Sequence, residues 1–156
     1  KLDVMDDTTY RNNPTKFYAV VSNLKTGLAE YIPIDDIKNY ECMEYLRASA
    51  SLPFVSRPVI INDTPYLDGG VCDSIPVQHF IDEGFEKIIV ILTRPKGYRK
   101  NGYIHLTNTF YKNYPEFSKT LKNRNHHYSS QCDLIEKLEK SKNRALFALF
   151  SKDFIY

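Results

Sequence analysis

The stretch of sequence that decides the fold reads Tyr66-Leu67-Asp68-Gly69-Gly70-Val71-Cys72-Asp73-Ser74-Ile75-Pro76-Val77. It follows Val59-Ile60-Ile61 across Asn62-Asp63-Thr64-Pro65, and two short extended pieces around a turn-rich tetrapeptide predict a β-hairpin. Asp68-Gly69-Gly70 predicts a tight loop at the end of a strand, because glycine accepts conformations that a Cβ forbids. Asp73-Ser74 are candidate caps of a following helix that has Pro76 in its first turn.

Two strands and a helix are expected before this hairpin. Residues 17–21 and 28–32 are rich in β-branched and aromatic side chains, and Lys25-Thr26-Gly27 separates them as a turn. Asp35-Asp36 offer N-caps for a helix that runs to about residue 50. The first half of the chain is therefore predicted to alternate strand pairs with a helix.

One further strand is expected after the hairpin. Residues 87–92 are continuously apolar in the middle, which is typical of a strand buried on both faces in a parallel sheet. A helix followed by a buried strand is an α/β signature. We expect strands near 17–21, 28–32, 59–67 and 87–92 to belong to one sheet.

The chain changes character after the last of these strands. Residues 94–127 hold eight Lys and Arg against one acid, Glu116, and many aromatic residues. Apolar residues recur there every three or four positions, with Pro115 expected to split the segment into two helices. A last helix is expected from Ser129-Ser130, with four apolar side chains facing inward: Leu134, Leu138, Ala145 and Leu149.

Three interpretations of the basic, aromatic segment remain open. Its helices could pack their aromatic side chains on the sheet, lie on anionic lipid, or bind single-stranded nucleic acid. We expect packing first and membrane contact second. Nucleic acid is not expected as a partner, because a net charge of +2 is too small for a typical phosphate-binding domain.

Composition indicates a reduced, cytosolic domain without a metal. The three cysteines are an odd number, far apart, and neither they nor the four histidines show metal-ligand spacing. No stretch has the length of a membrane-spanning apolar helix. We expect a cytoplasmic location, with peripheral membrane contact as the alternative.

Three segments, in order and spacing, resemble the patatin-like phospholipase family: Arg47-Ala48-Ser49-Ala50-Ser51-Leu52-Pro53, Pro58-Val59-Ile60-Ile61, and the decisive stretch itself. The resemblance covers about residues 16–93. It implies a three-layer α/β/α fold and a Ser–Asp dyad that hydrolyses carboxylic esters of lipids or lysophospholipids, with no metal or organic cofactor. By the same resemblance Asp68 is the catalytic aspartate, and Gly69 and Gly70 form the active-site loop.

The nucleophile of such an enzyme is not found in this sequence. No serine of the 156 residues lies in a G-x-S-x-G elbow, and no glycine-rich oxyanion loop is present. We therefore expect residues 1–156 to be the C-terminal portion of one hydrolase domain, with a mixed sheet over about 16–93 and a helical region over about 103–150.

Further expectations follow from that incompleteness. The partner of this portion is the N-terminal half of the same domain, and the chain alone should be inactive. A sheet edge or face left uncovered could drive homodimer formation. The alternative function is a non-catalytic binding or scaffolding domain of the same fold.

Overall fold

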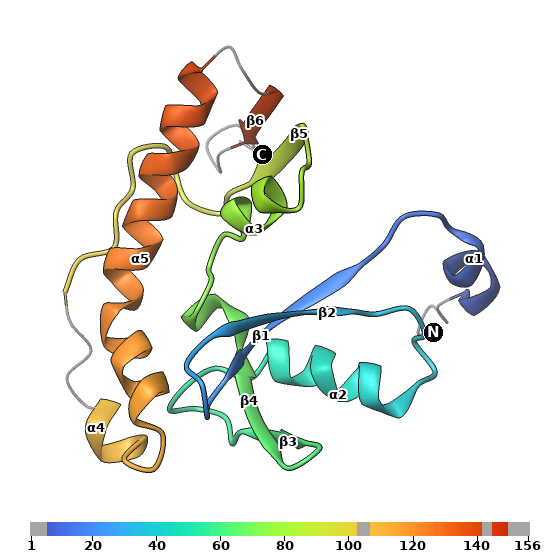
Figure 1. Ribbon diagram of the computed structural model, residues 1–156, viewed down its shortest axis with the longest axis vertical. Coiled ribbons are helices and arrows are strands. Elements are labelled where there is room, and N and C mark those ends of the chain that lie inside the picture. Colours follow the sequence, from blue (N-terminus) through green and yellow to red (C-terminus); the bar gives the residue numbers. More distant parts are fainter. Residues whose placement is uncertain (1–5, 103–106, 142–144, 150–156) are drawn as a thin grey trace. The chain divides into compact units, whose positions relative to one another are not determined.

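A computed structural model describes residues 6–102, 107–141 and 145–149 (Figure 1). The chain forms two compact units. The first contains Lys1–Cys72 and His105–Leu121, and the second contains Asp73–Ile104 and Lys122–Tyr156. Residues 1–5, 103–106, 142–144 and 150–156, among them part of the expected helical region, lie outside the described residues.

The first unit is built on a four-stranded antiparallel sheet of order β2-β1-β4-β3. Its strands are β1 (Tyr18–Asn23), β2 (Ala29–Pro33), β3 (Val59–Ile61) and β4 (Thr64–Asp68). The central pair, β1 and β4, aligns Val21 with Asp68. This register places the end of β4 beside the middle of β1, and both are predicted strands.

The β3–β4 hairpin is confirmed, with a shorter turn than expected. Ile61 pairs with Thr64, so only Asn62 and Asp63 form the turn, and Thr64 and Pro65 belong to β4. Both turn residues have positive φ, +47° and +59°. Asn and Asp tolerate this conformation better than other residues with a side chain, as a tight hairpin turn requires.

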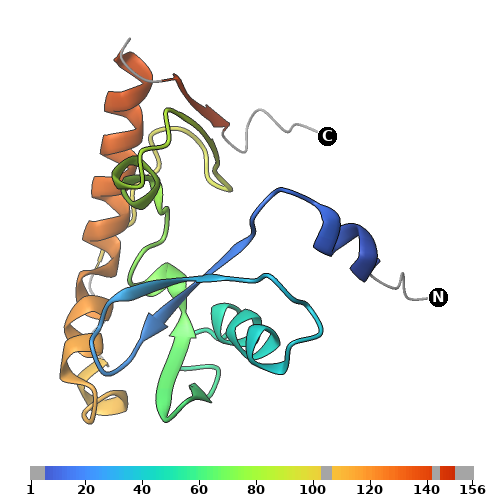
Figure 2. The ribbon, with the colours of Figure 1, turned by 45° about the vertical axis from the view of Figure 1, so that its right-hand side comes forward.

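Helix α2 (Tyr40–Ser49) packs against this sheet, as Figures 1 and 2 both show. The fully buried Ala48 lies in a core cluster with Val21 and Val59. The expected cap at Asp35-Asp36 is wrong: the helix starts later, at Asn39, whose side chain accepts the Glu41 amide. Asp36 instead accepts the Lys38 amide within a turn of its own. A short helix, α1 (Asp7–Asn12), precedes the sheet.

Pro115 separates two helices as predicted, α4 (Thr107–Phe110) and α5 (Pro115–Lys140). The expected new helix at Ser129-Ser130 is wrong, because α5 continues through both serines. Their hydroxyls donate to the Asn125 and His126 carbonyls one turn earlier, at 3.0 and 3.1 Å. Serine can satisfy its hydroxyl inside a helix in this way instead of capping a new one.

The second unit has its own parallel strand pair, β5 (Lys87–Ile91) with β6 (Ala145–Leu149). The expectation that residues 87–92 belong to one sheet with residues 17–21, 28–32 and 59–67 is therefore wrong. The expected placement of Ala145 and Leu149 in a helix is also wrong. A five-residue apolar run fits a helix or a strand equally well, and the parallel pairing with β5 decides for the strand.

Helix α3 (Val77–Asp82), β5 and α5 share a core cluster that includes Val77, Val90 and Ile135. Strand β5 is buried on one face only, since Ile89 and Ile91 are 70% and 67% exposed. The predicted cap of α3 is also wrong: Pro76 occupies that position without a side-chain hydrogen bond. Asp73 accepts a hydrogen bond from Gln131 of α5 instead. As predicted, the chain is a mixed α/β protein, compatible with part of the expected fold.

Candidate active site around Asp68

Asp68 is the last residue of β4, and hydrogen bonds hold its backbone from two sides. Its N–H donates to the Ser51 carbonyl at 2.9 Å, just after the end of α2. Its carbonyl accepts from the Ser22 hydroxyl of β1 at 2.8 Å. A helix end and a central strand therefore fix the position from which the Asp68 side chain extends.

The carboxylate of Asp68 is half-buried, and one of its two oxygens accepts a hydrogen bond. Its Oδ1 accepts the Gly70 N–H at 2.7 Å and so caps the short 3₁₀ helix η1 (Gly69–Val71). Within the described part of the chain, Oδ2 makes no hydrogen bond. One oxygen thus orients the group, while the other has lone pairs with which it can accept a proton or a hydrogen bond.

Gly69 is required by close packing against β1. A Cβ built on it would lie 2.7 Å from Cγ1 of Val20 and nearer still to the Val20 backbone carbonyl, a separation that real side chains do not show. Gly69 does not have positive φ. The sequence predicts a tight turn here, and the close approach of two backbones is the additional reason for glycine.

The Arg-Ala-Ser segment meets the Asp-Gly-Gly loop through Ser51. The Ser51 hydroxyl donates to the Arg47 carbonyl at 2.8 Å and its N–H donates to the Ala48 carbonyl at 2.9 Å. These bonds close the C-terminus of α2 and direct the Ser51 carbonyl to Asp68. Two segments that carry the family resemblance thus share one hydrogen-bonded structure.

Ser22 contributes to this site although its sequence context does not predict it. Ser22 is fully buried, and its hydroxyl also accepts the Cys72 N–H at 3.3 Å, so one side chain joins β1 to both ends of the loop. The contact depends on the register of β1 against β4. No local pattern around Ser22 indicates it.

Cys72 packs against the turn between β1 and β2. It is buried, and its thiol donates to the Gly27 carbonyl at 3.2 Å. Gly27 has a φ of +68°, and a Cβ there would lie 2.6 Å from the backbone of Glu116, so the β1–β2 turn rests directly on α5. Thr120 of α5 donates to the same carbonyl at 2.9 Å.

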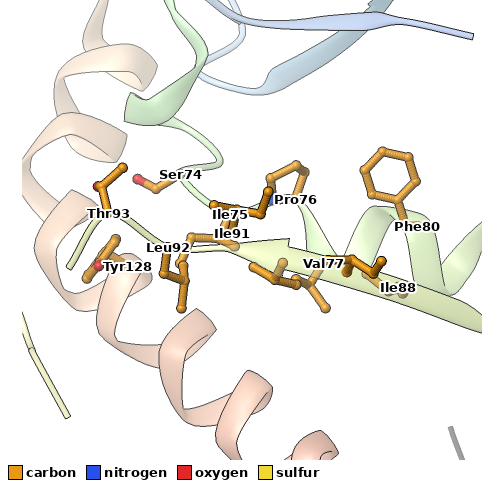
Figure 3. Close-up of a pocket in the computed structure, with 12 residues that line it drawn as sticks. Ser74, Ile75, Pro76, Val77, Phe80, Ile88, Ile91, Leu92, Thr93 and Tyr128 are labelled. Atoms are coloured by element: carbon orange, nitrogen blue, oxygen red, sulfur yellow. The ribbon is translucent and has the colours of Figure 1, made fainter. Parts of the chain in front are cut away.

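A pocket of about 380 Å³ lies within the second unit, and Figure 3 shows its lining side chains. Apolar residues of α3 and β5 line most of it, with Phe80 and Ile89 among them, and Tyr128 contributes a phenol from α5. None of the described residues that line it is an acid, a histidine or a cysteine. The hydroxyls of Ser74 and Thr93 also line it.

The described residues contain no group of three or more His, Cys, Asp or Glu side chains that could hold a metal ion. None of the helices in the same part of the chain is long and apolar enough to cross a membrane.

The family comparison matches the chain to the patatin-like phospholipase model over residues 3–81 of the 156. This range contains all four strands of the antiparallel sheet, helix α2 and the Asp68-Gly69-Gly70 loop, and it ends inside α3. No curated protein matches the chain.

Proposed function

Because the chain belongs to the patatin-like phospholipase family, a family of lipid acyl-hydrolases, we propose that it supplies the catalytic aspartate of a Ser–Asp dyad. The reaction is hydrolysis of a carboxylic ester in a lipid or lysophospholipid. Asp68 is the proposed base, and Gly69 and Gly70 form the loop that holds it. The nucleophilic serine would come from outside residues 1–156, since none of the serines here lies in a G-x-S-x-G elbow.

In the proposed reaction the serine oxygen attacks the ester carbonyl while its proton passes to the Asp68 carboxylate. Asp68 then gives this proton to the leaving alcohol as the C–O bond breaks. Water attacks the acyl-serine while Asp68 takes one of its protons, and that proton returns to the serine oxygen as the acid is released. Backbone N–H groups outside this chain would stabilise the oxyanion. No metal or organic cofactor takes part in these steps.

The hydrogen bonds that fix the position of Asp68 support this proposal. The Asp68 backbone is bonded to Ser51 and Ser22, and its Oδ1 is bonded to Gly70. A base must be held in a fixed geometry to accept a proton from a neighbouring hydroxyl. A solvent-exposed turn aspartate would not need a buried serine and a closely packed glycine around it.

The free state of all three cysteines fits the cytosolic location that we propose. Cysteine thiols commonly stay reduced in the cytosol.

The test is ester hydrolysis by the protein expressed from the complete open reading frame, compared with its Asp68→Asn variant. Asparagine keeps an oxygen that can accept the Gly70 N–H, but its amide cannot accept the serine proton. We expect kcat to fall by about 10²–10⁴, the usual contribution of a general base. The matched control is Asp63→Asn, the same chemical change at an exposed turn position that asparagine tolerates.

Full activity of Asp68→Asn would show that Asp68 is not the base. If the complete wild-type protein were inert towards short-chain esters and lysophospholipids, the hydrolase proposal would fail. The non-catalytic binding or scaffolding function would then take its place.

A further inference from the structure

Four large apolar side chains of the first unit are exposed on two segments that meet where the rings of Phe54 and Phe110 pack together, and we call them the apolar patch: Leu52, Phe54, Val55 and Phe110. These side chains are 48%, 39%, 84% and 60% exposed. Three of them come from the loop between α2 and β3, and Phe110 is the last residue of α4. A cluster of large apolar side chains on a protein surface is typical of an interaction site.

The aromatic part of this patch is anchored to the core. The ring of Phe54 packs edge-to-face with Phe110 and with Tyr111, at centroid distances of 5.3 and 5.6 Å. Its backbone N–H donates to the Tyr111 hydroxyl at 3.0 Å. Tyr111 is buried and packs on Phe117, which is completely buried. The patch is therefore presented by a fixed support.

Phe54 occupies a position that suits a smaller residue better. Its φ is +67°, in the left-handed region where a bulky side chain is an outlier and glycine or asparagine is normal. Strain of this kind persists where the surrounding structure enforces it, and it concentrates at functional sites. An exposed phenylalanine at such a position suggests that the ring itself is needed on the surface.

The charges of the two segments that carry the patch are all positive. Residues 52–58 contain Arg57 and residues 107–114 contain Lys112, with no acid in either segment. Both side chains are exposed. Apolar side chains accompanied by Lys and Arg match an anionic lipid surface, where the former enter the acyl boundary and the latter meet phosphates.

We propose that the patch of Leu52, Phe54, Val55 and Phe110 docks the protein on an anionic phospholipid bilayer, with Arg57 and Lys112 at the headgroups. Leu52 directly follows Ser51, whose carbonyl holds the Asp68 backbone. Docking would thus bring the lipid surface to the loop next to the proposed base. The choice of lipid as partner rests on the proposed function, but the docking is measured by binding and does not need catalysis.

The experiment is vesicle flotation of the complete protein with phosphatidylcholine vesicles, with and without phosphatidylserine. We expect binding that increases with phosphatidylserine. A Val55→Ser and Phe110→Ser double variant should lose at least about tenfold in vesicle affinity, because two apolar side chains no longer enter the bilayer. An Arg57→Gln and Lys112→Gln variant should lose about tenfold or more on anionic vesicles at low salt and little on neutral ones.

The matched control is Leu28→Ser, which removes an apolar side chain that is 66% exposed outside the patch and should leave binding unchanged. Circular dichroism and the thermal unfolding temperature report that each variant is folded. Equal affinity of the double variant and wild type, an equal loss in Leu28→Ser, or no vesicle binding by wild type would each overturn the proposal. Asp68→Asn should bind vesicles like wild type. Vesicle binding by a wild-type protein that has no esterase activity would therefore refute the proposed function and leave the docking surface standing.

Discussion

Replacing Gly69 with alanine should destabilise the first unit through a collision between two backbones. The added Cβ would lie 2.7 Å from Val20 Cγ1 and closer still to the Val20 carbonyl. Val20 cannot move away alone, because it is paired with Tyr31 in the β1–β2 ladder. A flexible side chain could give way at small cost, whereas this strand cannot.

The size of the effect follows from two opposing contributions. Forcing extra atoms into a packed site costs about 1–3 kcal/mol, and the upper value applies when the blocking atoms are backbone. Alanine restricts the unfolded chain more than glycine does, which offsets about 0.4–1 kcal/mol. The net loss of unfolding free energy is about 2 kcal/mol, which lowers Tm by about 4–8 °C in a protein of this length.

The assay is thermal unfolding followed by circular dichroism, with Gly84→Ala as the control. Gly84 has a φ of +87°, and no atom of the described residues lies within 4 Å of the Cβ that alanine would add there. Alanine at this position therefore experiences backbone strain without a collision. We expect a smaller decrease in Tm for Gly84→Ala than for Gly69→Ala. A Gly69→Ala protein that unfolds within about 1 °C of wild type would refute the packing argument.

Four further outcomes are expected. Ser22→Ala should lower the unfolding free energy by about 1–3 kcal/mol in urea titrations, because the Cys72 N–H and the Asp68 carbonyl lose a buried partner; the exposed Ser130→Ala should change it little. Burial raises the pKa of the Tyr128 phenol to about 12 in the folded protein, above its pKa of 10.0 in the unfolded chain. The protonated phenol therefore makes its full contribution to the unfolding free energy below the unfolded pKa, and this contribution is lost as the pH rises towards the folded pKa. In a pH titration, the tyrosinate absorbance of the wild type minus that of Tyr128→Phe should then rise only near pH 12. A rise near pH 10 would contradict this expectation. Iodoacetamide should modify Cys42 before Cys72 and Cys132 as mapped by mass spectrometry, because the latter two are buried and burial raises the pKa of the Cys132 thiol. The 156-residue chain should self-associate through Ile89 and Ile91, with Ile89→Lys reducing the mass measured by light scattering; a wild-type monomer at high concentration would exclude this.

The parts of the fold that sequence predicted well are those set by neighbouring residues. The Asn62-Asp63 turn follows from the tolerance of these residues for positive φ, and Pro115 marks a helix start because it lacks an N–H. Both depend on chemistry within a few positions.

The parts that it predicted wrongly depend on contacts far along the chain. Asp73 would cap a helix if only its neighbours mattered, but Gln131 bonds to it and to the Ile75 N–H. Strand β6 becomes a strand through pairing with β5, more than fifty residues earlier. No pattern inside either segment carries that information.

The candidate site shows the same division. Asp68 was identified by resemblance, and the resemblance works because Ala48, Ser51 and Gly69 have steric and hydrogen-bonding roles that other residues would not fill. The sequence did not predict a role for Ser22, because a serine near the end of a strand is common. Its hydroxyl reaches the Asp68 carbonyl only because Val21 pairs with Asp68 in the sheet.

This division also explains why the motif cannot by itself distinguish an enzyme from a binding domain. Most of its residues support the position of the Asp68 backbone, and a scaffold that had lost catalysis would still need them to fold. The carboxylate differs, since asparagine could accept the Gly70 N–H equally well and leave the support unchanged. Folding alone therefore does not require an acid at position 68. A carboxylate is required there only if its second oxygen accepts a proton. An Asp68→Asn variant that keeps the Tm of the wild type and loses ester hydrolysis would show that the second oxygen accepts a proton.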